Sequence, residues 1–159
     1  MATEPRRVRP PKRTLPNSNT RTLEWLIEHG PLQTKQKALM FAAALGAYQN
    51  RREPFSSAEE PIRWQIFENN GDDAFIYALA IAETGGFEVL ADEDGERYVS
   101  LFEEYANGGL EYLEEHVINQ PVGVLDALID LLVQVRRHAS DTHPGLEGIT
   151  PAQLDALGL

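Results

Sequence analysis

Cysteine is absent from the 159 residues of this chain. Its absence excludes disulfide bonds, thiolate metal ligands and a cysteine nucleophile, and it fits a reducing cytoplasm. Long hydrophobic runs are missing too, because the longest apolar stretches cover only 38–45 and 74–82. A transmembrane helix needs roughly 20 apolar residues, and residues 1–22 lack the apolar centre of a signal peptide. We therefore expect a soluble, cytoplasmic protein that does not enter a membrane.

Lysine is scarce, and Lys12, Lys35 and Lys37 all lie in the first quarter of the chain. A phosphate-binding loop needs a lysine directly after a glycine-rich turn, which this sequence does not provide. The acidic half also lacks the lysine that metal-dependent nucleases commonly pair with their acids. The four histidines form no i, i+4 pair, and no serine lies in a tight glycine turn. We expect no catalytic residue, no metal site and no cofactor.

The net charge of −11 is unevenly distributed. Residues 1–63 hold 11 Lys/Arg against 6 Asp/Glu, whereas residues 64–159 hold 3 against 19. Contact with a polyanion such as DNA is therefore expected through the N-terminal part. The acidic remainder should repel nucleic acid or bind a basic protein.

Hydrophobic periodicity predicts a mostly α-helical, compact single-domain bundle, with at most a small strand pair near 64–67 and 87–90. For residues 62–68 two alternatives stay open, one or two helical turns or a short strand. Helices are predicted over 22–28, 37–48, 74–82, 123–137 and, after a capping box, 151–157.

Two of these helices, 37–48 and 74–82, are apolar on every face and are predicted to be buried all round. Thr34 is the expected N-cap of the first, and Asp72 or Asp73 that of the second. Residues 96–118 leave two alternatives open. Either one helix continues through Gly108-Gly109 because another backbone packs there, or the glycines separate two helices.

Proline and arginine dominate residues 1–19, which predicts a flexible basic arm before a helical domain at 20–138. Residues 139–159 are predicted to form a linker and a short C-terminal helix. The arm is either solvated, or it grips phosphate or an acidic partner. For the basic residues after the arm, the alternatives are ion pairs with Glu53, Glu59 and Glu60, or a phosphate-facing strip. The candidate DNA- or phosphate-binding residues are Arg6, Arg7, Arg9, Lys12, Arg13, Lys35, Lys37, Arg51, Arg52 and Arg63.

Apolar residues cover most of the predicted helix 123–137, leaving one narrow polar stripe. So broad an apolar surface is typical of burial between two layers or of an interface with a partner, including a second copy of this chain. The candidate interface residues are Leu125, Leu128 and Leu132 of this helix, and Leu154 and Leu157 of the C-terminal one.

Four stretches in order along the chain carry a resemblance to a known family: LMFAAALGAYQNRREP (39–54), EPIRWQIFENNGDD (60–73), LAIAETGGFEVLADE (79–93) and FEEYANGGLEYLEEHV (102–117). They resemble the DNA phosphorothioation-associated protein 4 family, also called Dnd system-associated protein 4, over roughly residues 20–135. The resemblance implies a prokaryotic protein encoded with systems that replace a backbone oxygen of DNA by sulfur and restrict unmodified invading DNA. It brings no catalytic residues with it.

Two functions follow as expectations. The first is a non-enzymatic accessory protein of such an antiviral defence system, which binds system proteins and also DNA through its N-terminal basic part. The alternative is an acidic helical adaptor, oligomeric scaffold or DNA-mimicking regulator that binds only protein. A hydrolase or nuclease with an unfamiliar site is a third, disfavoured class.

Overall fold

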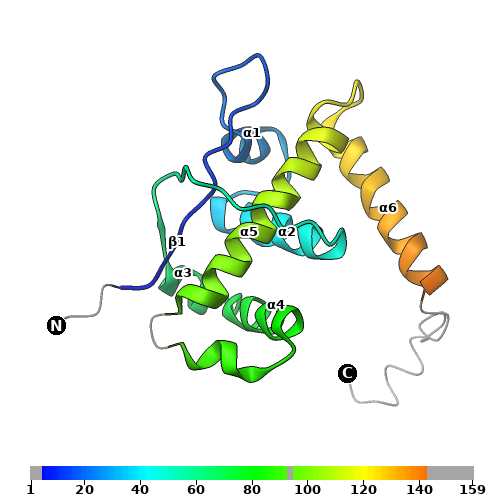
Figure 1. The fold of residues 1–159 in the computed structure, drawn as a ribbon. Helices are drawn as coiled ribbons and strands as arrows, with labels where there is room; N and C mark the ends of the chain where they lie inside the picture. Colours follow the sequence, from blue (N-terminus) through cyan, green and yellow to red (C-terminus); the bar gives the residue numbers. More distant parts are fainter. Residues whose placement is uncertain (1–4, 93–94, 143–159) are drawn as a thin grey trace. The chain divides into compact units, whose positions relative to one another are not determined.

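The computed structural model describes residues 5–92 and 95–142, and most of these are helical (Figure 1). This confirms the predicted mostly α-helical fold. The chain divides into two compact units, residues 1–119 and 120–159. The boundaries predicted at residues 19 and 138 stay a prediction. The α-helices are α1 (Thr22–His29), α2 (Lys35–Tyr48), α3 (Trp64–Asn70), α4 (Asp73–Thr84), α5 (Glu96–Leu113) and α6 (Val124–Thr142).

The first unit is built on the close crossing of α2 and α5 (Figure 1). A Cβ atom on Gly46 of α2 would collide with the carbonyl oxygen of Tyr105, and one on Gly109 of α5 would collide with that of Ala42. Glycine at both positions therefore lets the two backbones touch. This contact offsets the roughly 1 kcal/mol that an interior glycine costs a helix relative to alanine.

The same contact decides the question left open over residues 96–118. α5 runs without a break through Gly108 and Gly109 and continues into a π-helical turn, η2 (Glu114–Ile118). Gly108 also has a packing partner, because a Cβ there would collide with the carbonyl oxygen of Arg51. The one-helix alternative is therefore correct, and the packing that it required is present.

α2 begins as predicted after Thr34, whose side-chain oxygen accepts a hydrogen bond from the backbone N–H of Lys37 (3.3 Å). The prediction that this helix is buried on every face is wrong, because Ala44 is exposed and Tyr48 is 41% exposed. Its inner face, which includes Leu39 and Ala43, is fully buried.

α4 departs further from the prediction of complete burial. Only Ile76 and Ala80 are buried, whereas Ala74, Ala78 and Ala82 follow one another on an exposed face. The alanine side chain is a single methyl group, so leaving it exposed to water costs little hydrophobic free energy. An alanine-rich face therefore has a weaker tendency to be buried than its apolar residue type suggests. Asp72 precedes the helix but makes no cap, because its carboxylate accepts a hydrogen bond from the Gln36 side chain instead.

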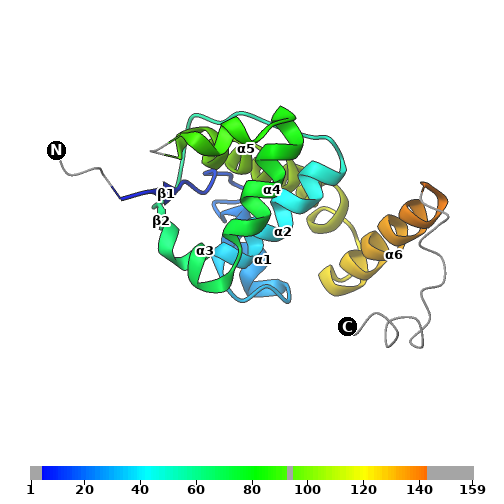
Figure 2. The same ribbon diagram turned by 90° about the horizontal axis from the view of Figure 1, so that it is seen from below.

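The predicted strand pair is in a different place. Residues 87–90 form part of a 3-10 helix, η1 (Phe87–Ala91), and residues 64–67 belong to α3. The two-stranded antiparallel sheet of the described residues joins β1 (Arg7–Val8) to β2 (Ile62–Arg63). Figure 2 shows β1 and β2 beside the start of α3, at one edge of the first unit.

An aromatic cluster lies beneath this sheet, where α3, α4 and α5 meet. Trp64 and Phe67 of α3 stack with ring centroids 6.0 Å apart, and Phe67 packs edge-on against Phe102 of α5 at 5.9 Å. Tyr77 of α4 and Tyr98 of α5 complete it at 5.2 Å from each other. Buried aromatic rings contribute much of the packing energy of a small core, so this cluster gives the sheet a rigid support.

The second unit contains α6. This helix was predicted to end near residue 137, but it continues to Thr142, so the first residues of the predicted linker are helical. The remainder of that linker and the predicted helix at 151–157 lie outside the described residues.

Candidate functional site

Residues 5–19, which the sequence predicted to form a flexible arm, have a defined path along the first unit. Val8 is fully buried, and the backbone pairing of β1 with β2 is extended by two further hydrogen bonds. The N–H of Glu59 donates to the carbonyl oxygen of Pro10, and the N–H of Lys12 donates to that of Ser57, both at 2.8 Å. We call this pair of segments, residues 6–12 and 57–64, the basic ribbon.

Arg9 joins the basic ribbon to α5. Its guanidinium donates to both carboxylate oxygens of Glu103, with the shortest contact at 2.7 Å, and its backbone N–H donates to the same carboxylate at 2.6 Å. The Glu103 side chain is 1% exposed, whereas that of Arg9 is 57% exposed. Burial raises the pKa of Glu103 although Arg9 opposes it, and the hydrogen bond to Glu103 raises the pKa of Arg9. The pair therefore fixes β1 but places a carboxylate in a poorly solvated position.

Arg13 makes a second attachment, to Glu114 at the start of η2, eleven residues after Glu103. Two of its nitrogens lie 2.9 Å from the two carboxylate oxygens of Glu114, and a third bonds to Asn107 at 3.3 Å. Thr22 of α1 donates to the same Glu114 carboxylate at 2.5 Å. Four extended residues span roughly 13 Å and eleven helical residues roughly 16 Å, so arm and helix run alongside each other with matched spacing.

The two arginines after α2 are also held by acids. Arg51 bonds to Glu111 and Glu115 of α5 and η2 at 2.9 Å each, and these hydrogen bonds lower the pKa of Glu115. Arg52 pairs with Glu83 of α4 at 2.5 Å and with Glu104 of α5 at 3.2 Å. These contacts fasten the chain after α2 to the helices on both sides.

Lys35 pairs with the fully buried carboxylate of Glu59 at 2.6 Å. Of the ion pairs predicted for the basic residues after the arm, this one is present. Arg51 and Arg52 pair with α4, α5 and η2 instead of with Glu53 or Glu60. Five of the ten candidate DNA-binding residues are thus engaged in ion pairs within the first unit: Arg9, Arg13, Lys35, Arg51 and Arg52.

Arg6 is held by aromatic rings. Its guanidinium carbon lies 5.3 Å from the Trp64 ring centroid and 5.1 Å from that of Tyr98, within the range of a cation–π contact. Gly95 has a left-handed φ of 69°, and a Cβ there would collide with the Arg6 side chain and the Tyr98 hydroxyl. Glycine is therefore needed at this position for both its conformation and its size.

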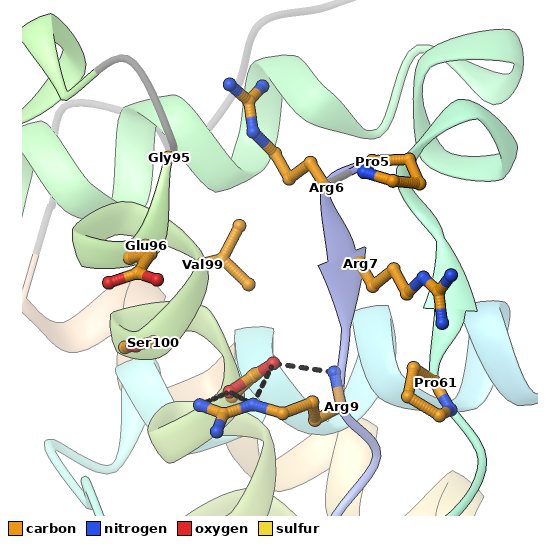
Figure 3. Close-up of a pocket in the computed structure, with 10 residues that line it drawn as sticks. Pro5, Arg6, Arg7, Arg9, Pro61, Gly95, Glu96, Val99 and Ser100 are labelled. Carbon is orange, nitrogen blue, oxygen red and sulfur yellow. Dashed lines mark hydrogen bonds and ion pairs between the residues drawn. The ribbon is translucent and has the colours of Figure 1, made fainter. Parts of the chain in front are cut away.

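A half-open cavity of about 570 Å³ separates the basic ribbon from the start of α5 (Figure 3). Figure 3 shows the Arg9–Glu103 contact at one end of it and Arg7 extending towards β2. Its lining residues are Pro5, Arg6, Arg7, Arg9, Pro61, Gly95, Glu96, Val99, Ser100 and Glu103.

Four of the candidate cations, Arg7, Lys12, Lys37 and Arg63, are exposed. Within the described ranges, 5–92 and 95–142, none of the four takes part in an ion pair. Arg7 and Arg63 are direct partners across the antiparallel sheet. The structure thus brings together two predicted residues whose positions are 56 apart in the chain.

The predicted partner interface falls on α6 and on the tail. Leu125 and Leu132 are 59% and 53% exposed, whereas Leu128 is buried. Leu154 and Leu157 lie outside the described residues.

Within the part of the chain that the structure describes, no group of three or more acids and histidines is placed to hold a metal ion. In the same part, no helix has the length and apolar character that crossing a membrane requires. The Nδ1 atoms of His29 and His116 donate to the carbonyl oxygens of Trp25 and Tyr112, one turn earlier in each case.

Sequence reasoning missed the attachment of the arm to α5. The signal was present, because Glu103, Asn107, Glu111 and Glu114 recur at helical spacing and form a polar stripe on α5. In the structure Glu103, Asn107 and Glu114 of this stripe are buried, and their partners come from the arm. A stripe of acidic and polar residues on one face of a helix can therefore indicate contact with another segment of the same chain as readily as exposure to solvent.

These features define a small helical protein whose acids and arginines mainly hold its own segments together. In a comparison with family models, residues 16–147 match the model of DNA sulphur modification system-associated protein 4, and the chain belongs to that family. The match confirms the resemblance and extends it to residue 147. No match was found among curated proteins or among solved structures. Arg6, Arg7, Arg9, Lys12 and Arg13 precede the matched residues, whereas Glu103 and Glu114, which bind two of them, lie within the match.

Proposed function

We propose that this protein is a non-enzymatic, cytoplasmic accessory component of a DNA sulphur modification and restriction system. It binds other proteins of the system and contacts DNA through exposed cations of its N-terminal half, namely Arg7, Lys12, Lys37 and Arg63. The observation that carries the proposal is the division of the basic residues. One set is neutralised by Glu59 and by acids of α4, α5 and η2, and the other is exposed and without ion pairs in the described ranges.

The protein-binding half of the proposal is supported by the family and by α6. The family is associated with a DNA sulphur modification system, so a protein partner from that system is the simplest expectation. On α6, Leu125, Ile129, Leu132 and Val133 are between 41% and 59% exposed. Large apolar side chains exposed close together on one helix are typical of protein interfaces.

This apolar surface also favours a second candidate, an adaptor or scaffold that binds only protein and associates with itself. Light scattering on the purified chain distinguishes the two in part, because a strict monomer at all concentrations argues against self-association through α6. A monomer leaves the accessory role intact.

Two experiments test the leading proposal. Purification of the tagged chain from cells that carry the whole modification operon should recover a stoichiometric protein of that system. A gel-shift assay at low salt should show a complex with duplex DNA that weakens as salt rises, since phosphate contacts release counterions. Recovery of the chain by itself contradicts the protein half, and a missing gel shift contradicts the DNA half. Cleavage of modified or unmodified DNA by the metal-supplemented protein would contradict the non-enzymatic role.

A further inference from the structure

We propose that Arg7 and Arg63 form one anion site on the basic ribbon, and that its ligand is a backbone phosphate of DNA. This inference rests on the DNA contact in the proposed function and narrows it to two side chains.

The register forces the two arginines together. The N–H of Trp64 donates to the carbonyl oxygen of Arg6 at 3.1 Å, so residues 6 and 64 are a hydrogen-bonded pair of the antiparallel ladder. The next pair, Arg7 and Arg63, is then a non-hydrogen-bonded pair, where facing side chains lie closest and on the same face of the sheet. Like charges at such a position destabilise a sheet unless an anion lies between them.

No carboxylate of the described residues supplies that anion. The neighbouring arginines differ, because Arg6 is held against the Trp64 and Tyr98 rings and Arg9 by Glu103. Figure 3 shows Arg7 extending over the β2 side of the ribbon, while Glu96 and the guanidinium of Arg9 lie on the α5 side. Glu103 of α5 is the ion-pair partner of Arg9. Arg7 and Arg63 are both exposed.

The surroundings suit a phosphodiester. Each guanidinium presents a planar fork of N–H donors that matches the oxygens of a phosphate group. Beside Arg7 the cavity of about 570 Å³ offers the apolar surfaces of Pro5, Pro61 and Val99, against which a deoxyribose adjoining the phosphate can pack. A protein carboxylate would use the same two arginines but would leave this surface uncovered.

The charge nearby limits the site to weak, salt-sensitive binding. Glu60 is exposed on the same ribbon and Glu96 borders the cavity, and the whole chain carries a net charge of −11. Both acids disfavour a second phosphate close to the first. For one or two phosphate contacts, a plot of log affinity against log salt concentration should have a slope of roughly −1 to −2.

The test measures fluorescence anisotropy of a labelled 20-base-pair duplex with full-length protein at 50 and 200 mM salt. Arg63→Glu should weaken binding at 50 mM salt roughly tenfold or more, since it removes one charged contact and opposes the phosphate. Arg137→Glu is the matched control, because it makes the same change of charge at an exposed arginine of α6. It should weaken binding less than about threefold.

Thermal unfolding followed by circular dichroism separates binding from folding. Arg63→Glu places a carboxylate opposite Arg7, which replaces a like-charge pair by an ion pair, so the melting temperature should stay unchanged or rise. A lower melting temperature together with weaker binding would overturn the inference, because the loss would then follow from a damaged sheet.

The remaining outcomes are distinct. If the unmodified protein binds the duplex and Arg63→Glu binds equally well, or if Arg137→Glu weakens binding as much, this site is refuted while the DNA contact in the proposed function survives. If the unmodified protein does not bind the duplex at 50 mM salt but binds an oligoglutamate peptide through Arg63, the site belongs to an acidic protein partner and the proposed DNA contact fails as well. The same measurement is repeated with a duplex that carries one phosphorothioate at its centre. If Arg7 and Arg63 form the site, Arg63→Glu should weaken binding of this duplex by the same factor.

Discussion

The close crossing of α2 and α5 predicts how much stability is lost when a single Cβ atom is added between the two helices. Gly109→Ala adds a Cβ that would collide with the carbonyl oxygen of Ala42, a backbone atom that cannot rotate away. The two helices must therefore separate, which weakens the contacts of buried Leu39 and Leu110 across the same core. Overpacking of this kind costs about 1–3 kcal/mol or more, and it exceeds the roughly 1 kcal/mol that alanine gains over glycine in a helix.

We expect Gly109→Ala to lower the free energy of unfolding by about 1–3 kcal/mol, since the separation of two backbones outweighs the propensity gain. For a unit of the size of residues 1–119, this loss corresponds to a fall of roughly 4–12 °C in melting temperature. Circular dichroism at 222 nm during heating, and urea titration at 25 °C, measure the two quantities.

Gly123→Ala is the matched control, because a Cβ there would meet only the Asp126 carboxylate at 3.4 Å, an ordinary contact. It should leave the melting temperature within about 2 °C of that of the unmodified protein. If Gly109→Ala melts at the same temperature as the unmodified protein, or higher, the close crossing is wrong and the reasoning about α5 fails with it.

Three further predictions concern charges and surfaces. Arg9→Met removes the partner of buried Glu103 and should cost about 1–3 kcal/mol at pH 8, since the exposure of Arg9 screens part of the interaction. Because the pKa of Glu103 is raised above the ordinary 4.5 in the folded state, stability falls as pH rises through the raised value. Arg9→Met should raise this pKa further. The loss of unfolding free energy caused by Arg9→Met, measured by urea titration, should therefore be smaller at pH 5 than at pH 8. Burial raises the pKa of Tyr98 and Tyr105 from 10 to about 12. Absorbance at 295 nm during a pH titration should therefore show that two of the five tyrosines ionise late, and stability should fall between pH 10 and 12 because these two side chains ionise there only in the unfolded state. Ionisation of all five tyrosines near pH 10 would contradict the burial. Leu132→Glu, on the exposed surface of α6, should reduce recovery of the protein partner without lowering the melting temperature of the first unit; unchanged recovery would exclude Leu132 from the interface.

Local signals in the sequence predicted much of the helical fold. Thr34 was expected to cap α2 and does so, because a cap depends on residues only three apart. The start of α6 was predicted within one residue. Its end was not, since residues 138–142 carry no apolar period that would distinguish helix from linker.

Long-range pairing was beyond the sequence. β1 contains only Arg7 and Val8, too few residues for an alternating pattern, and its partner lies more than 50 residues later. The proline-rich composition of residues 5–19 indicated a flexible arm, yet Arg9 and Arg13 bind acids that are 94 and 101 residues away. The glycines on α5 posed a question that only the position of α2 could answer.

The sequence predicted which basic residues are candidates for the site, but not which of them face solvent. All ten basic residues were identified as candidates, but residue type does not distinguish an arginine that pairs internally from one that faces solvent. Which acids lie within reach is a property of the packed helices, and it assigns Arg51 to the first group. Arg63 falls in the second group because it is exposed, and the register of the sheet places it opposite Arg7.

We propose that the basic residues have two separate tasks, holding the fold and contacting DNA. The most direct measurement determines melting temperature and duplex affinity at 50 mM salt for Arg51→Met and Arg63→Met side by side. Arg51→Met should lose about 1–2 kcal/mol of stability, because it removes the ion pairs of Arg51 with Glu111 and Glu115, and it should keep its affinity for DNA. Arg63→Met should keep its stability and lose roughly tenfold in affinity. If both variants lose the same property, or if Arg51→Met is the one that loses affinity, the division of tasks is contradicted.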